Sequence, residues 1–81
     1  MKARVTVTLK SGILDPQGKA IAGALGGLGY AGLGEVRQGK LIEIDLPDAG
    51  DRAQATKAVE EMCRTLLANP VTEDFRVELT D

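Results

Sequence analysis

The chain has 81 residues, a length that fits a single domain covering residues 1–81. Ten basic and twelve acidic side chains give a net charge of −2, which does not favour nucleic-acid binding, because that function calls for a basic face. The sequence contains no histidine and one cysteine, Cys63, so it excludes Ser-His-Asp and Cys-His catalysis, metal sites built on histidine, and a disulfide within the chain.

The first third of the chain predicts a strand followed by a helix. Residues 2–10 alternate between apolar and polar side chains, the period of a half-buried strand. Asp15 suits a helix N-cap, and Pro16 is tolerated at the first helical position. Apolar residues then recur at helical spacing and predict a helix over Pro16–Leu28, with Gly29 ending it in a left-handed conformation.

Two glycine motifs lie in this helix and just after it. Gly23 and Gly27 have the G-x-x-x-G spacing, which we interpret as close approach of the helix to the sheet. Residues 27–32 match G-x-G-x-x-G, but this match follows a helix instead of opening one. A dinucleotide site needs the reverse order, so we interpret these glycines as a helix stop and a connection.

The middle of the chain predicts two more strands. A short strand is expected over Leu33–Gln38, with Val36 pointing inward, and Gln38-Gly39 is expected to form a tight turn. The third strand follows over Leu41–Leu46, and Pro47 ends it.

The last third predicts a helix and a final strand. The helix is expected to start near Asp48 or Asp51, since Asp51 and Gln54 have the spacing of a capping box, and to end at Asn69-Pro70. Cys63 lies on its apolar stripe and is interpreted as a buried structural residue. Alternation over residues 74–79 predicts the fourth strand.

The predicted order is βαββαβ, and each element has one apolar face. We therefore predict an α+β fold: a two-layer, ferredoxin-like sandwich in which two helices cover one face of an antiparallel four-stranded sheet. The sheet edges then need cover, and pairing with a second copy would provide it.

Two connections are candidate binding segments. Lys10 lies near a helix N-terminus, where an anion such as phosphate could bind; a capped connection with a surface lysine explains the same residues. Asn69 and Pro70 end the second helix, and an exposed segment there could also be a docking surface. For each segment, the residues alone do not decide between a binding role and a purely structural one.

Several stretches together give the chain a family resemblance. The stretches are Leu9–Ile21 (LKSGILDPQGKAI), Leu28-Gly29-Tyr30, Arg37–Lys40 and Met62–Val71 (MCRTLLANPV). In this order, and over essentially the whole chain, they resemble the PurS family. LDPQG (Leu14–Gly18) and LLANPV (Leu66–Val71) are the most specific parts.

The resemblance implies a function without catalytic residues. PurS proteins accompany an ATP-dependent synthetase (PurL-type) and a glutaminase (PurQ-type), which make formylglycinamidine ribonucleotide with ammonia taken from glutamine. We therefore expect a non-catalytic bridging subunit that self-associates as a dimer or tetramer. It should bind no metal or cofactor itself, while ATP, Mg²⁺ and glutamine are used by the partner subunits. The expected partner-contact residues are Lys10, Asp15, Gln17, Gly18, Asn69 and Pro70.

The composition and the predicted fold bear on two other classes of function. Ferredoxin-like dimers can bind a small ligand at the interface between protomers, so a regulatory module is the alternative. A stand-alone enzyme is disfavoured by the missing histidine and by the single serine, Ser11. The lone cysteine and the lack of an apolar run of about 20 residues lead us to expect a cytoplasmic protein without a membrane partner.

Overall fold

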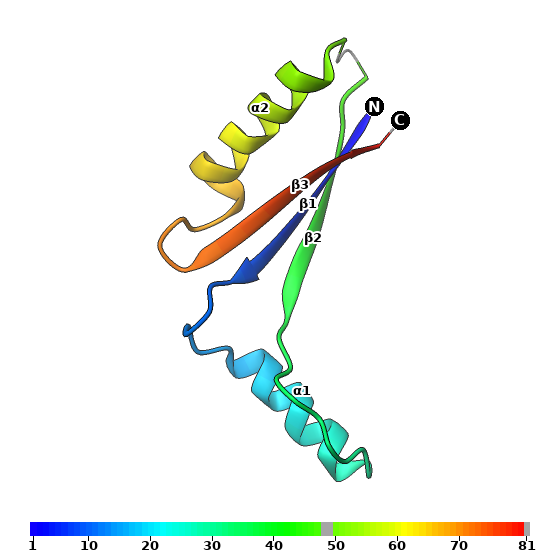
Figure 1. Cartoon of the computed structure of the whole chain (residues 1–81), viewed down its shortest axis with the longest axis vertical. Helices are drawn as coiled ribbons and strands as arrows, with labels where there is room; N and C mark the ends of the chain where they lie inside the picture. Colours follow the sequence, from blue (N-terminus) through cyan, green and yellow to red (C-terminus); the bar gives the residue numbers. More distant parts are fainter. Residues whose placement is uncertain (48–49, 81) are drawn as a thin grey trace.

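The computed structural model describes residues 1–47 and 50–80 and has an α+β fold. Strand β1 (Lys2–Leu9) lies at the centre of a three-stranded antiparallel sheet, between β2 (Gly39–Asp45) and β3 (Glu73–Thr80). Lys2 pairs with Asp45 on one side and with Thr80 on the other, so the sheet joins the two ends of the described chain (Figure 1). Three of the four predicted strands are thereby confirmed.

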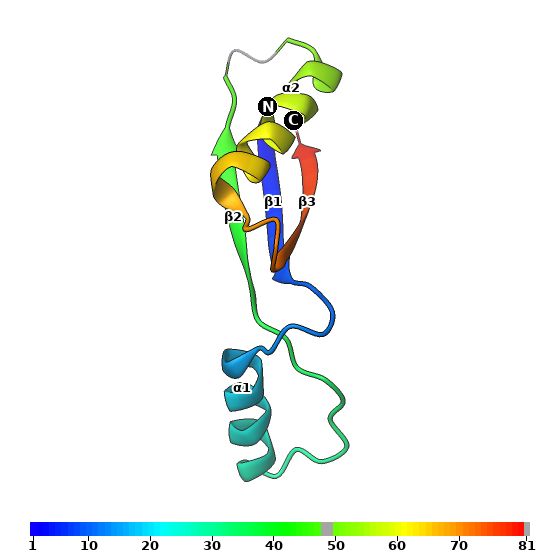
Figure 2. The same ribbon diagram turned by 90° about the vertical axis from the view of Figure 1, so that its left-hand side faces the viewer.

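One face of the sheet is covered by the second helix. Helix α2 (Arg52–Met62) continues into a π-helical segment, η1 (Cys63–Leu67), and both lie against this face (Figures 1 and 2). The helix was predicted to start near Asp48 or Asp51. Asp51 is its N-cap, and Asp48 lies outside the described residues. The helical segment ends before Asn69-Pro70, as predicted.

The core lies between this helix and the sheet. The alternation of β1 places three of its apolar residues on the covered face, where at most 1 % of each is exposed. Half-buried apolar residues from the other two strands surround them. The buried cluster consists of Ala3, Val5, Val7, Val59, Cys63 and Ala68. The prediction that Cys63 is buried is therefore confirmed.

The first helix forms where it was predicted but does not pack on the sheet. Helix α1 (Pro16–Gly27) has Asp15 as its N-cap, and Gly29 follows it with φ at +98°, as expected. It lies at the opposite end of the molecule from α2 (Figures 1 and 2). The prediction that both helices cover one face is therefore wrong for a single chain. Apart from the helix's own backbone and the adjacent residues, no described atom lies within 4 Å of an ideal Cβ at Gly23 or Gly27, so their predicted close approach to the sheet is also absent.

The predicted strand Leu33–Gln38 is also absent, and so is the turn at Gln38-Gly39. Residues 33–38 have no regular secondary structure and no strand partner, and they lead directly into β2 (Figure 1). The Asn-Gly type of hairpin turn needs positive φ at its central residues, and Gly39 is not among the glycines with positive φ. Without a turn this segment cannot fold back beside β2, so it gains no ladder of hydrogen bonds.

We call residues 11–38 the arm. The arm makes the chain elongated, with extents of 49 × 27 × 15 Å and a radius of gyration of 16.0 Å. A compact chain of this length has a radius of gyration of about 12 Å.

Candidate functional site

The candidate site is the junction where both connections of the arm meet the sheet. Asp15 holds the two connections together through its carboxylate. The backbone N–H of Gly18 donates to Oδ1 at 2.8 Å, which caps α1, and the N–H of Gln38 donates to Oδ2 at 2.8 Å. These two hydrogen bonds, that from Gln38 first, hold the pKa of Asp15 below its usual range because they stabilise the charged carboxylate.

Further hydrogen bonds reinforce the junction. The side-chain amide of Gln38 donates to Oε1 of Gln17 at 2.7 Å. The Arg37 guanidinium donates to the carbonyl of Leu9 and, at 3.1 Å, to that of Lys10. The residues before α1 are therefore tied to those before β2, and the direction of the arm is fixed.

Gly18 allows this close crossing because it has no side chain. It is the one buried residue of α1. A Cβ at this position would overlap the backbone oxygen of Val36 and lie 2.8 Å from Oδ2 of Asp15. Gly18 thus contributes to the geometry of the junction and offers no exposed side chain.

Lys10 links the junction to the turn that precedes β3. Its Nζ forms an ion pair with Asp74 at 2.7 Å, and its backbone N–H donates to the carbonyl of Thr72 at 2.8 Å. In that turn Asn69 Oδ1 accepts from the N–H of Val71 at 3.0 Å. Pro70, which is exposed, lines a hollow of about 290 Å³ together with Lys10.

The structure thus gathers the six predicted residues around one end of the sheet. Asp15 and Gln17 line a second hollow, of about 480 Å³, and Glu73 lines both hollows. The sequence indicated no role at the site for Arg37 or Gln38, although both lie in a stretch that carries the family resemblance, and it indicated none for Glu73 or Asp74. The stretch Arg37–Lys40 could have pointed to Arg37 and Gln38 as site residues. No sequence pattern indicates that Asp74 pairs with Lys10.

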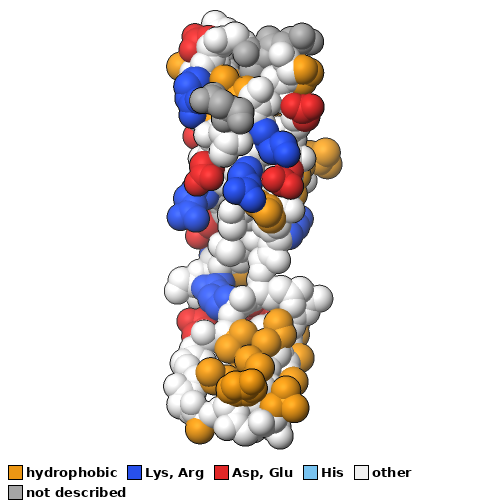
Figure 3. All heavy atoms as spheres, turned by 90° about the vertical axis from the view of Figure 1, so that its right-hand side faces the viewer, with side chains coloured by type: hydrophobic (Ala, Val, Ile, Leu, Met, Phe, Trp, Pro, Cys, Tyr) orange, Lys and Arg blue, Asp and Glu red, His pale blue; other side chains and the backbone are white. Residues whose placement is uncertain are grey.

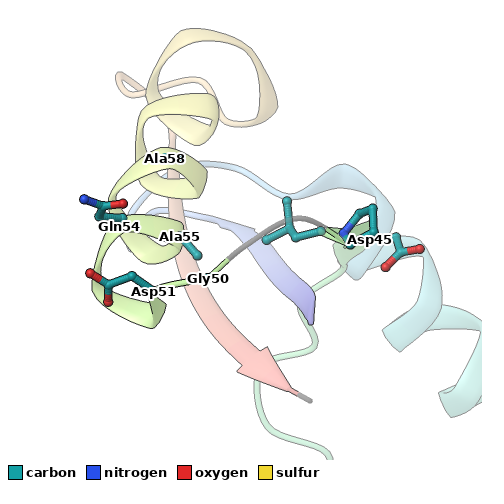
Figure 4. Close-up of a pocket in the computed structure, with 8 residues that line it drawn as sticks. Asp45, Gly50, Asp51, Gln54, Ala55 and Ala58 are labelled. Atoms are coloured by element: carbon teal, nitrogen blue, oxygen red, sulfur yellow. The ribbon is translucent and has the colours of Figure 1, made fainter.

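A third hollow, of about 420 Å³, lies between α2 and the end of β2. Figure 4 shows that the side chains of Asp51 and Gln54 point away from it, as does that of Asp45, while the methyl group of Ala55 points inward. A small-ligand site needs polar groups that converge on the ligand. The polar groups of this hollow diverge, so it gives no support to the regulatory alternative.

The described residues offer no reactive thiol, no metal site and no membrane-spanning helix. Burial raises the pKa of the Cys63 thiol, which disfavours the reactive thiolate. Among the residues described, no cluster of acidic or sulfur ligands could hold a metal ion. No helix in the described part of the chain has the length and apolar character that crossing a bilayer requires.

Comparisons with known proteins agree over nearly the full length. The family model described as PurS, phosphoribosylformylglycinamidine (FGAM) synthase, matches residues 2–81. The PurS subunit of phosphoribosylformylglycinamidine synthase from Mycobacterium leprae is 47% identical over 76 residues, which are 94% of this chain and 91% of that protein.

Two solved structures have the same fold. The crystal structure of Methanocaldococcus jannaschii PurS, one of the subunits of formylglycinamide ribonucleotide amidotransferase, matches with a TM-score of 0.84 and 40% identity, covering 95% of this chain and 92% of that one. A chain of PurLQS from Thermotoga maritima matches with a TM-score of 0.76 and 28% identity, covering 95% and 93%.

Proposed function

The chain belongs to the PurS family, and on that premise we propose that it is the small subunit of a phosphoribosylformylglycinamidine synthase. In this role it holds a PurL-type synthetase and a PurQ-type glutaminase together. The observation that carries the proposal is the match of nearly the whole fold to a chain of a PurLQS structure. The protein acts in purine biosynthesis by assembly and does not act on a substrate itself.

We assign all of the chemistry to the partner subunits. ATP, Mg²⁺ and glutamine bind there, and this chain supplies no catalytic group. The absence of histidine from the sequence supports this division of labour, as does the burial of Cys63, the one thiol. The purified chain alone should hydrolyse neither glutamine nor ATP.

A bridging subunit is useful because ammonia is small and readily lost. Ammonia released by the glutaminase is protonated in water and diffuses away unless the two active sites are kept in register. A bridge must therefore be rigid where it turns. The Asp15, Gln17 and Arg37 hydrogen bonds supply that rigidity at the junction of arm and sheet.

We propose that the junction carries partner contacts through Lys10, Gln17, Asn69 and Pro70, while Asp15 and Gly18 set its shape. Lys10→Ala and Gln17→Ala should each weaken assembly with the synthetase and glutaminase about tenfold, the loss expected for one charge-assisted or interfacial hydrogen bond. Lys57→Ala, which removes an exposed lysine from α2, is the control. Assembly is measured by sedimentation. If both junction variants fold normally and assemble as tightly as the wild type, Lys10 and Gln17 are not partner contacts.

The function itself is tested by omission. Cognate synthetase and glutaminase are combined with ATP, Mg²⁺ and formylglycinamide ribonucleotide, and either glutamine or ammonia is added, with and without this protein. Product formation from glutamine should need the protein, whereas product formation from ammonia should not. Glutamine-dependent activity that persists without the protein would overturn the bridging role.

We also propose that the chain self-associates and that a complete ferredoxin-like sandwich exists only in the assembly. The support is the unpacked arm: a 12-residue helix is marginal in water without tertiary packing.

A further inference from the structure

The turn between η1 and β3 exposes apolar side chains. We call residues 66–72 the apolar turn, because this segment has no acidic or basic side chain, in a chain with ten basic and twelve acidic ones. Leu66 is 83 % exposed and Val71 77 % exposed, more than any other large apolar side chain among the described residues. Pro70 is exposed as well. Figure 1 shows the turn (orange) curving out beyond the sheet before β3 begins. Apolar side chains gathered in one exposed segment are typical of a protein interaction site.

Hydrogen bonds centred on Asn69 hold this turn in one conformation. Its side-chain Oδ1 accepts from the N–H of Val71 at 3.0 Å. Its carbonyl accepts from the N–H of Thr72 at 3.2 Å and from that of Glu73 at 2.7 Å, and its own N–H donates to Oε1 of Glu73 at 2.7 Å. Ala68, which is 6 % exposed, anchors the start of the turn in the core. A segment that is fixed before binding loses little conformational freedom on binding, so the exposed apolar side chains are preorganised.

The charges that flank the apolar turn neutralise one another. Lys10 forms its ion pair with Asp74 on one side, and Arg64 forms an ion pair with Glu61 at 3.9 Å on the other. The turn therefore presents apolar side chains inside a rim without a dominant sign of charge. Nucleic acid or an anionic membrane would need a basic rim, whereas an apolar pocket on another protein matches this surface.

The open face of the sheet is different in kind. Figure 3 shows charged side chains spread over it, while hydrophobic side chains gather over the arm below. Arg4 on β1 forms an ion pair with Glu43 on β2 at 3.4 Å, between residues that are paired across the two strands. Leu41, which is 54 % exposed, lies on this face among polar neighbours. Such a face is typical of a solvated surface, so it supplies a control for the apolar turn.

We propose that the apolar turn inserts Leu66, Pro70 and Val71 into an apolar pocket on one partner subunit of the synthase. The N–H of Lys10 donates to the carbonyl of Thr72, so the turn is continuous with the junction and meets the same subunit as Lys10 does. Asn69 and Glu73 are positioning residues, because they act on the partner through the shape of the turn. This inference specifies a contact of the bridging subunit and rests on the proposed function.

The first test is the binding of surface variants to each cognate subunit, and to both together, by sedimentation. Val71→Asp should weaken binding to one subunit about thirtyfold, because it places a carboxylate in an apolar pocket, and Leu66→Asp should do the same. Lys10→Ala should weaken binding to that same subunit. Leu41→Asp, an equal change on the open face of the sheet, is the matched control and should bind like the wild type.

Three results of this test would overturn the inference. They are wild-type binding by Val71→Asp and Leu66→Asp, an equal loss in Leu41→Asp, and a loss of affinity for a different subunit from the one that Lys10→Ala affects. Circular dichroism should show the helix content of the wild type in every variant, since the replaced side chains are exposed.

The second test concerns the positioning role of Glu73. Glu73→Ala removes the acceptor for the Asn69 N–H and should weaken the same binding about fivefold, the loss expected for one hydrogen bond. Glu73→Gln keeps an oxygen in that place and should restore binding to within about twofold. In the Val71→Asp variant, Glu73→Ala should cause no further loss, because the two residues act as a unit. Equal losses for Glu73→Ala and Glu73→Gln, or additive losses in the double variant, would show that Glu73 does not act through the turn.

The inference and the proposed function fail in different ways. A wild-type chain that is needed for glutamine-dependent product, with a Val71→Asp variant that binds and supports the reaction equally well, would overturn the inference and leave the function standing. A wild-type chain that binds a cognate subunit through the turn, but whose omission leaves glutamine-dependent product unchanged, would do the reverse.

Discussion

Asp15 has two roles that a sequence pattern shows only in part. Its position before Pro16 predicts the N-cap, and the cap is present. The second oxygen, which accepts from Gln38, joins segments 23 residues apart, and no local pattern encodes that contact. One carboxylate thus both starts α1 and fixes where the arm points.

This geometry predicts a pH-dependent contribution to stability. Folding lowers the pKa of Asp15, so the unfolded chain binds a proton more readily. The stabilisation is therefore complete above the unfolded pKa of about 3.9 and is lost as the pH falls through the folded pKa. Asp15→Ala should lower the urea midpoint at pH 7, and the difference from wild type should shrink below about pH 4. Lys57→Ala is the control. If the difference in urea midpoint between Asp15→Ala and the wild type stays constant from pH 7 to pH 3, this account is wrong.

Gly18 gives a second test at a single residue. Gly18→Ala should destabilise the protein by about 1–3 kcal/mol, because the new Cβ overlaps the Val36 oxygen and backbone must shift. Gly23→Ala makes the same change in the same helix where nothing lies within 4 Å. Urea unfolding of the two variants therefore separates the effect of steric overlap with Val36 from the effect of helix propensity. Equal urea midpoints would mean that the backbone near Gly18 accommodates the added methyl group without cost.

The candidate site was predictable to the extent that its residues lie in connections. Lys10, Asp15 and Gln17 were named because they match the family motif and lie in or beside the connection between a strand and a helix, and they do meet at the junction. Asp74 could not be named, because its ion pair with Lys10 spans 64 residues and depends on the register of β3 against β1. Contacts of this kind follow from the sheet and not from local sequence.

Helix α2 is stabilised by burial of its apolar side chains against the sheet, which gives a third prediction. Val59 on α2 is 0 % exposed, so Val59→Ala should lower the free energy of unfolding by about 2 kcal/mol through lost burial and the cavity left behind. Val71→Ala, at a position 77 % exposed, should change it by less than about 0.5 kcal/mol. Chemical denaturation of both variants measures the difference, and similar losses would mean that α2 is not the main cover of the sheet.

Alternation was sufficient to predict β1, β2 and β3, because each has a partner within the chain. It failed for residues 33–38, where Val36 was the one clear inward residue and glycines precede it. The helical spacing of the apolar residues in 16–28 correctly predicted a helix there. This spacing does not say what the apolar side chains pack against, so the packing of both helices on one sheet could not be decided from it.

The molecule as a whole should unfold in a way that depends on its concentration. If the native protein is a dimer, dissociation accompanies unfolding, and mass action links the two. A hundredfold dilution then lowers stability by about 2.7 kcal/mol at 25 °C, which calorimetry or circular dichroism would record as a fall in Tm. A wild-type Tm that is independent of protein concentration would contradict a dimeric native state.

The pairing of β1 with β3 also governs when the chain can fold. Lys2 pairs with Thr80, 78 positions later, so the central strand meets one of its neighbours only when nearly all of the described chain is present. During synthesis the apolar side of β1 stays open while the arm and α2 emerge from the ribosome. Such a high contact order slows folding, and it leaves the nascent chain open to chaperones, and to aggregation, until its last strand appears.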